Sequence, residues 1–309
     1  MFDTIAQENL ITNPSFEDID SCFGNLAPLG FDVFEWSGCD GWSNPIYSSS
    51  DLWCQGAKNE ILAPPNSACF QSVNDGQNMA GIIIADPTLW NYREYLQNKL
   101  KSKLKKDKMY EIRFNVSSCL SFCSIYEIGV KFESNKFKNN SKLDLTNLVP
   151  DALNDENNYI TDSSGWQNIK LNYLANGYEE FAIFGCFADS INLKYTMDNC
   201  DTTFWNGQNL ATDYIFFDNF SIIEKESSYK IPNILTLNND GLNDEFIYEI
   251  INLTNWKITF FNRWGNQITF LNQETQNFDF TNLTEGVYYY FLEADELSSN
   301  QQGFLTIIK

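Results

Sequence analysis

The chain has 309 residues, 43% of them hydrophobic, and its 25 Phe, 15 Tyr and 8 Trp predict two globular domains that are mainly β. There is no histidine, which excludes Ser-His-Asp and Cys-His catalysis and every histidine-based zinc site. The 41 Asp/Glu against 20 Lys/Arg give a formal charge of −21, which repels phosphate backbones, so we expect no nucleic-acid partner.

The acidic excess suits a soluble protein outside the cell, and it also leaves room for cation binding by some carboxylates. A hydrolase that uses two carboxylates needs no histidine, but no acidic pair stands out by its spacing. We therefore expect a protein that is not an enzyme. The longest apolar run is MAGIIIA (79–85), which is too short for a transmembrane segment.

The first third of the chain predicts few regular elements. ENLITNPSFE (8–17) predicts a strand that ends at a turn, and the Gly-, Ser-, Pro- and Asn-rich residues 20–78 predict long loops. MAGIIIA predicts a buried strand, and WNYREYLQNKLKSKL (90–104) predicts the one helix of the chain. The apolar face of that helix would consist of Tyr92, Tyr95, Leu96, Leu100 and Leu104.

From residue 109 the hydrophobic pattern has period two, which is typical of strands with one buried face. Such strands are expected at 109–118, 125–133, 166–175, 179–187 and 212–223. Short alternating strands, one helix and long loops predict an all-β fold, an antiparallel jelly-roll sandwich, for this domain.

A second domain follows the charged linker EKESSYKIP (224–232). Its roughly eighty residues contain five short strand patterns, which predict a small Ig-like β-sandwich. They are expected within 244–250, 256–262, 266–271, 286–294 and 302–309. We place the two domains at residues 1–226 and 229–309.

The eight cysteines all lie in the first domain. An even number with scattered spacing predicts disulfides and an oxidising compartment, although spacing alone does not give the pairing. They are Cys22, Cys39, Cys54, Cys69, Cys119, Cys123, Cys186 and Cys200.

Two ligand sites follow from residue types. If the first and last strands of the jelly roll lie side by side, Glu17 and Asp218 face each other, and a hard cation such as Ca²⁺ would relieve their repulsion. The alternative is two exposed acids in turns. The loop tryptophans, Trp42 and Trp53 first, would either stack on sugar rings or close the loops against the sheet.

The Asn- and Asp-rich stretch LNNDGLNDEF (237–246) is another candidate for calcium binding. It lacks the twelve-residue layout and the closing Glu of an EF-hand loop. This pattern favours a plain Asx-rich turn.

Four motifs in order carry a resemblance: IPNILTLNNDGLNDEF (231–246), ITFFNRWGNQITF (258–270), LTEGVYYYFLEA (283–294) and GFLTIIK (303–309). Together they resemble the gliding-motility-associated C-terminal domain of Bacteroidota. The family usually has proline where this chain has Leu237, and its Trp-Asp-Gly segment is weakened here to NFDFTN.

This resemblance implies a type B sorting domain, which the translocon and shuttle protein of the type IX secretion system bind. It implies export across the outer membrane to the cell surface or the medium. The motif for recognition would be the turn formed by Asn262, Arg263, Trp264, Gly265 and Asn266. Gly265 is expected at the positive-φ position of that turn.

The first domain is similar to galactose-binding-like, carbohydrate-binding-module jelly rolls of Bacteroidota surface proteins. The similarity lies in seven segments, in this order: NLITNPSFE, SSDLWC, NDGQNMAGI, NYREYLQNKL, YEIRFNVSS, FAIFGCF and YIFFDNFSI. It implies a structural Ca²⁺ at Glu17 and Asp218 and a Cys22–Cys54 bridge. Proximity then suggests Cys186–Cys200 and Cys119–Cys123, which leaves Cys39–Cys69.

The sequence thus predicts a secreted, non-enzymatic surface protein that works in adhesion or glycan binding, with a link to gliding motility. One alternative is a structural or accessory subunit of a surface or secretion assembly that binds protein and no sugar. The other alternative is a glycan-acting enzyme.

Overall fold

The computed structural model describes residues 7–20, 39–48, 50–54, 71–85, 92–120, 124–139, 144–161, 165–188, 195–196, 213–297 and 299–309. The chain divides into two compact units, Met1–Lys106 with Tyr110–Ile223, and Glu224–Lys309 with Asp107–Met109. Both are all-β. Within the described ranges the only helix is the short 3-10 turn η3, Phe280–Asn282, and no helix there is long and apolar enough to cross a membrane.

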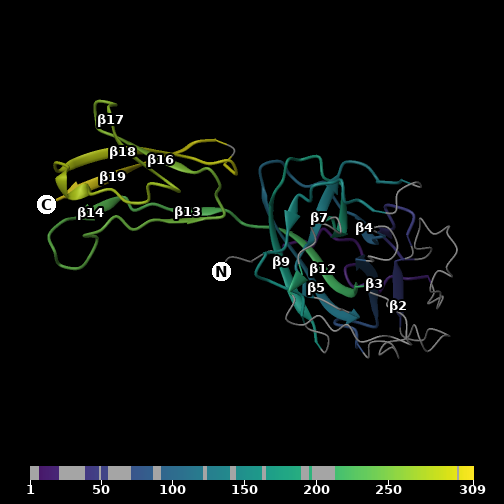
Figure 1. Ribbon diagram of the computed structural model, residues 1–309. Helices are drawn as coiled ribbons and strands as arrows, with labels where there is room; N and C mark the ends of the chain where they lie inside the picture. The colour runs from purple at the N-terminus through teal and green to yellow at the C-terminus, as the bar shows by residue number, and fades with distance from the viewer. Residues whose placement is uncertain are drawn as a thin grey trace. The chain divides into compact units, whose positions relative to one another are not determined.

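The first unit contains two five-stranded sheets (Figure 1). One has the strand order β1 (Trp42–Ser43), β4 (Tyr95–Lys99), β10 (Phe181–Cys186), β7 (Ile128–Glu133), β8 (Ala152–Leu153). The other has the order β2 (Asp51–Cys54), β3 (Asn78–Ala85), β12 (Asp213–Glu224), β5 (Met109–Leu120), β9 (Gln167–Leu174). A small pair, β6 (Ser124–Ile125) and β11 (Tyr195–Thr196), accompanies them.

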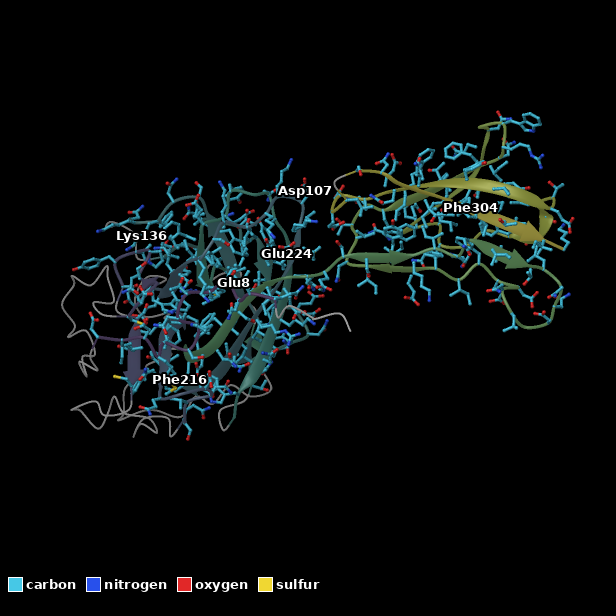
Figure 2. All side chains as sticks on the ribbon, turned by 180° about the vertical axis from the view of Figure 1, so that it is seen from behind. Glu8, Asp107, Lys136, Phe216, Glu224 and Phe304 are labelled. Atoms are coloured by element: carbon cyan, nitrogen blue, oxygen red, sulfur yellow. The ribbon has the colours of Figure 1, made fainter. Side chains whose placement is uncertain are left out.

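The alternating strands bury one face each between the two sheets, and side chains fill that space (Figure 2). On β5 the buried residues are Tyr110, Ile112, Phe114 and Val116, at the period of two that the sequence shows. The strands predicted from residue 109 onward are present as β5, β7, β9, β10 and β12. The sandwich prediction is confirmed to this extent.

The predicted helix at 90–104 is wrong, because its central residues form β4 between β1 and β10. Tyr95 and Leu96 point to opposite faces of the sheet and are both buried, so this strand lacks an exposed face. The amide of buried Gln97 donates to the Ser43 hydroxyl and accepts from the Phe137 N–H. Such a strand has no period-two signal, and tertiary pairing overrides the helical spacing.

The first described segment lies beside the last strand of the first unit, as expected. The Leu10 N–H donates to the Ile222 carbonyl, and the Phe220 N–H donates to the Pro14 carbonyl, both at 2.9 Å. The segment is not the strand that the sequence predicts, because its ladder pairings are isolated bridges, from Ile11 to Leu100 and from Ile19 to Cys39. Side chain–backbone bonds around Asn9 supply further contacts with β12.

The second unit has one five-stranded sheet and a two-stranded ribbon (Figure 1). The sheet order is β14 (Ile234–Thr236), β19 (Gln301–Ile308), β18 (Gly286–Glu293), β16 (Lys257–Phe261), β17 (Gln267–Asn272). The ribbon pairs β13 (Ser228–Lys230) with β15 (Glu249–Ile251). Of the strand expected at 244–250, only the end is formed, because Asp244 belongs to the preceding loop.

One face of this sheet is packed and forms a core of its own. It contributes Ile258, Phe260, Tyr288, Tyr290, Leu292, Leu305 and Ile307, which pack with Trp256 and Phe280. All described members of this cluster lie between residues 231 and 307, so the second unit has the separate core that an independent domain needs.

Candidate functional site

The predicted turn between β16 and β17 is confirmed in detail. The Asn262 N–H donates to the Asn266 carbonyl at 3.0 Å, and the Gly265 N–H donates to the Asn262 carbonyl at 2.9 Å. The Asn262 side-chain oxygen also accepts from the N–H groups of Trp264 and Asn266. Gly265 has φ +80°, a conformation that glycine adopts without strain.

This turn displays an apolar side chain instead of burying it. Trp264 is 79% exposed, although the large tryptophan side chain is mostly buried in folded proteins. The backbone beneath it is held by four hydrogen bonds, so the indole projects from a fixed loop. A rigid turn with an exposed aromatic residue is suited to recognition by another protein.

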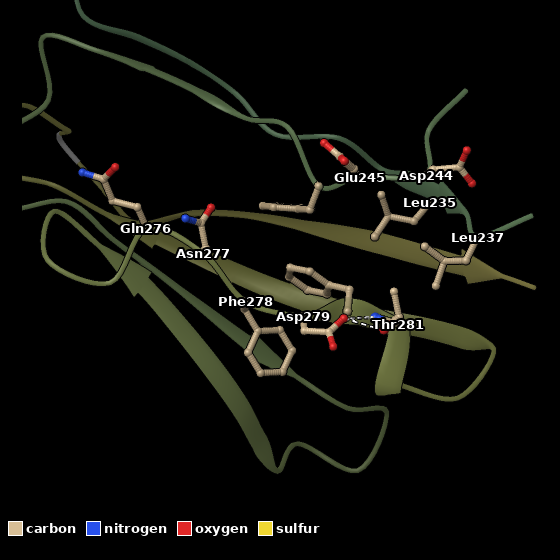
Figure 3. A pocket seen from close by; sticks show the side chains of 11 residues that line it. Leu235, Leu237, Asp244, Glu245, Gln276, Asn277, Phe278, Asp279 and Thr281 are labelled. Carbon is tan, nitrogen blue, oxygen red and sulfur yellow. Dashed lines mark hydrogen bonds between the residues drawn. The ribbon is translucent and has the colours of Figure 1, made fainter. Parts of the chain in front are cut away.

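A small cavity of about 230 Å³ lies elsewhere in the second domain, between the 244–246 and 276–281 segments (Figure 3). Leu235, Leu237 and Phe278 supply much of its apolar lining. The carboxylate of Asp279, which also lines it, accepts from the N–H of Thr281. The volume is below that of usual small-molecule sites, so we assign it no ligand.

The Asn- and Asp-rich loop beside this cavity is an Asx-rich turn, as the sequence favours. Asp244 accepts from the N–H groups of Asn238, Asn239 and Gly241. Both carboxylate oxygens of Asp244 therefore bind backbone N–H groups of the loop itself. These hydrogen bonds explain why Asn and Asp residues are concentrated in the loop without invoking a bound cation.

The side chains of Glu17 and Asp218 both contact the turn formed by residues 74–78. Their carboxylate oxygens accept hydrogen bonds from backbone N–H groups of that turn. One Asp218 oxygen accepts from Asn74 and Asp75 at 2.9 Å, and one Glu17 oxygen accepts from Gln77 and Asn78 at 2.8 Å. Calcium needs such oxygens as ligands, and the described residues contain no cluster of three or more acidic, cysteine or histidine side chains that would hold a metal. Structural calcium at Glu17 and Asp218 stays a prediction.

The two tryptophans predicted to stack on sugars are buried. Trp42 is 5% exposed in the main core, where it packs on Phe16 and Phe220, and its indole N–H donates to the Asn13 carbonyl. Trp53 is also 5% exposed, and it packs on Phe216 on the outer side of its sheet. The stacking prediction is therefore wrong for this conformation, because neither ring has a free face.

Two of the predicted disulfides are wrong, because Cys39 and Cys186 are free, buried thiols in the main core. Burial raises the pKa of Cys39 to about 12 and that of Cys186 to about 11, so both stay protonated and pack as small apolar groups. Cys54 is disulfide-bonded. Its predicted partner Cys22, together with Cys69, Cys123, Cys200 and the side chain of Cys119, lies outside the described residues, so those pairings stay predictions.

Sequence reasoning missed a buried acidic pair, Asp51 and Glu94. The Tyr214 hydroxyl donates to Asp51 at 2.7 Å, and the Tyr92 hydroxyl donates to Glu94 at 2.9 Å. Burial and the nearby Glu94 raise the pKa of Asp51 to about 8. Nothing in the spacing links position 51 with position 94, because β3 and the chain after it bring them together.

This pair predicts that the first domain loses stability as the pH rises from about 4 to about 8. In that window the folded Asp51 keeps a proton that the unfolded chain has released, so deprotonation favours unfolding. We expect Asp51→Asn to flatten the pH profile of the urea midpoint, because the amide does not titrate. The exposed Glu156→Gln is the control, and equal profiles for the two variants would contradict the prediction.

Comparison with protein families identifies the second domain. Residues 229–307 match the family model described as the CHU_C Type IX secretion signal domain. Such a signal implies export out of the cell and contact with the secretion machinery. The match covers less than half of the chain and says nothing of the first domain.

No curated protein matches the sequence. Among solved structures, the chain is similar to a Clostridium thermocellum xylanase 10B structure, CBM22-1 and GH10 modules with xylohexaose. The identity is 12% and the TM-score 0.35, over 74% of this chain and 31% of that one. It is also similar to the CBM22-1 xylan-binding domain of Paenibacillus barcinonensis Xyn10C, with 11% identity and a TM-score of 0.33, over 67% and 99% of the two chains.

A third similar structure is the adhesin domain of Epf from Streptococcus pyogenes, with 12% identity and a TM-score of 0.31 over 98% and 97% of the two chains. This chain spans about a third of the xylanase structure. Such low identities and TM-scores do not establish a shared fold or ligand, so the function of the first domain has to be argued from other observations.

Proposed function

We propose that this protein is exported by the type IX secretion system and acts at the cell surface or outside the cell. Residues 229–309 would be the export signal. The observation that carries this proposal is that the matched residues form a compact unit with its own core, from which the turn at 262–266 displays Trp264. A folded domain that displays an exposed aromatic side chain on an ordered turn offers another protein a defined surface to bind.

For the first domain we propose binding in place of catalysis, as an adhesin or a glycan-binding module. Its sequence resemblance to carbohydrate-binding jelly rolls supports this role. The Asp51–Glu94 pair is buried and engaged by tyrosine hydroxyls, which does not suit a hydrolase whose two carboxylates must face a substrate.

One observation favours a second candidate, an accessory subunit that binds protein and no sugar. The burial of Trp42 and Trp53 removes the two platforms expected to bind sugars. A glycan-binding screen with the full chain separates the candidates. Saturable sugar binding supports the module, whereas no binding together with a stable, identified surface-protein partner supports the subunit.

The export proposal is tested by removing residues 229–309 in cells that have a type IX secretion system. We expect the full chain in the medium or on the cell surface and the truncated chain in the periplasm. Protease resistance of the retained first domain shows that it is folded, so retention is not caused by misfolding. Equal export of the two chains would contradict the proposal.

A further inference from the structure

The outer face of the second domain's sheet is aromatic where sandwich outer faces are usually polar. In the β16–β18–β19 ladder, Phe261 pairs with Tyr289, and Tyr289 pairs with Phe304. Directly paired residues share a face, so these three side chains lie opposite the core. Phe291 and Phe270, each paired with Thr259, lie on the same side, and we call these five residues the aromatic face.

The aromatic face is uncovered within its own domain. Tyr289 and Phe304 are each 50% exposed, and Figure 2 labels Phe304 on β19. The rings are ordered against one another, since Phe261 and Phe291 meet edge to face at 5.6 Å between centroids. A contiguous patch of this kind on a soluble domain marks a site for interaction with another protein or a membrane.

The aromatic face continues into the turn at 262–266. A hollow of about 590 Å³ lies between them, lined by Phe261, Arg263, Tyr289, Phe291 and Phe304 among others. This volume is large enough to accept side chains of a partner. The turn that the sequence resemblance singles out and the aromatic face thus form one surface.

The charge of this surface differs from that of its domain. Residues 229–309 contain ten Asp/Glu and only four Lys/Arg. Two of the four, Lys257 and Arg263, lie at the aromatic face, with the Lys257 ammonium 5.0 Å from the Phe270 ring centroid. Glu293, paired with Lys257, is the acid on the same side. Arg263 therefore places one cation at the turn end of the aromatic face, whereas at the other end Lys257 lies opposite the acidic Glu293.

We propose that the aromatic face, with the hollow beside Arg263, is the surface by which the secretion machinery holds this domain. The occupant is an apolar surface of a machinery protein, rimmed by carboxylates that meet Arg263. The proposal rests on the export function proposed above and names the part of the signal domain that is bound. Aromatic residues and arginine are the side chains that dominate binding energy in protein interfaces.

The test compares export of three full-length chains. One is the natural chain, the second carries both Tyr289→Thr and Phe304→Thr, and the third carries both Leu242→Thr and Ile247→Thr. Threonine keeps strand propensity at positions 289 and 304. Leu242 and Ile247 are exposed apolar residues of the same domain outside the aromatic face, so they are matched controls. We expect export to fall about tenfold or more for the first variant, because interface aromatics are frequent hot spots, and to stay unchanged for the second.

The outcomes distinguish the two proposals. Export of all three chains at equal rates overturns the aromatic face and leaves the export function standing. Failure of the natural chain itself to leave the cell overturns the export function. Thermal unfolding of each purified chain shows whether a variant has lost its fold.

A second measurement decides the matter even where the threonine variant does not fold. Benzoylphenylalanine replaces Tyr289 in one full-length chain and Ile247 in another, and both are irradiated during export. A crosslink from position 289, but not 247, to an identified secretion-machinery protein supports the proposal. A crosslink from 289 to a second copy, to the first domain or to lipid, or no crosslink at all, overturns it.

Discussion

Phe220→Ala is expected to destabilise the first domain by about 3–5 kcal/mol, the usual cost of removing a fully buried ring. Phe220 is the centre of an aromatic cluster, with its ring centroid 4.8 Å from that of Phe184 and 4.9 Å from that of Trp42. Phe16, Phe114 and Phe217 surround it on the other sides. The alanine would leave a cavity that the five surrounding rings, four of them from the two sheets, cannot close without losing their own contacts.

The measurement is urea unfolding of the full chain, followed through the transition of the first domain. Phe220→Leu is expected to fall between the natural chain and the alanine variant, because it retains part of the buried volume. Val149→Ala is the control, since Val149 is largely exposed in the same domain. A midpoint for Phe220→Ala close to that of Val149→Ala would show that the cluster does not hold the sheets together.

Glu179→Ala is expected to have a second large effect, also about 3–5 kcal/mol. One oxygen of this buried carboxylate accepts from the Tyr173 hydroxyl and the Asn176 N–H, both at 2.7 Å. The other accepts from the Gly177 N–H at 2.8 Å. Alanine would leave three donors without their charged acceptor, the buried Tyr173 hydroxyl and two backbone N–H groups of partly buried bonds, at about 1–3 kcal/mol each.

Glu179→Gln separates the hydrogen bonds from the loss of volume. Its amide oxygen preserves the bonds to Tyr173 and Asn176, whereas its NH₂ group meets the Gly177 N–H, so we expect a smaller loss. The neighbouring Glu180→Ala is the control, because Glu180 is half exposed and its ion pair with Lys103 at 3.8 Å contributes little. If the variants at 179 and 180 unfold at the same urea concentration, the buried network is not a main source of stability.

The strands from residue 109 onward could be predicted because each one buries a single face, which makes the side chains alternate. The same argument fails for β4, where Tyr95 and Leu96 are buried on opposite faces and polar Gln97 is buried as well. Hydrophobic period carries no information about a strand that lacks a solvent-exposed face.

Only the local part of the candidate site in the second domain could be predicted from the sequence. The turn at 262–266 is a local structure, fixed by Asn262 and Gly265 themselves. The aromatic face needs the pairing of four strands, although GVYYYFLE already places aromatic residues at both phases of its alternation. The burial of Trp42 could not be predicted, because composition does not distinguish a tryptophan exposed on a loop from one packed in the core.

The strand order of the first unit has a consequence for synthesis of the chain. β12 lies in the middle of its sheet, between β3 and β5, yet it is the last strand of that unit to leave the ribosome. Until residue 224 has emerged, β3 and β5 have unpaired edges and the Phe220 cluster has no centre. The first domain therefore completes this sheet only when the segment that leads directly into the second domain has been made.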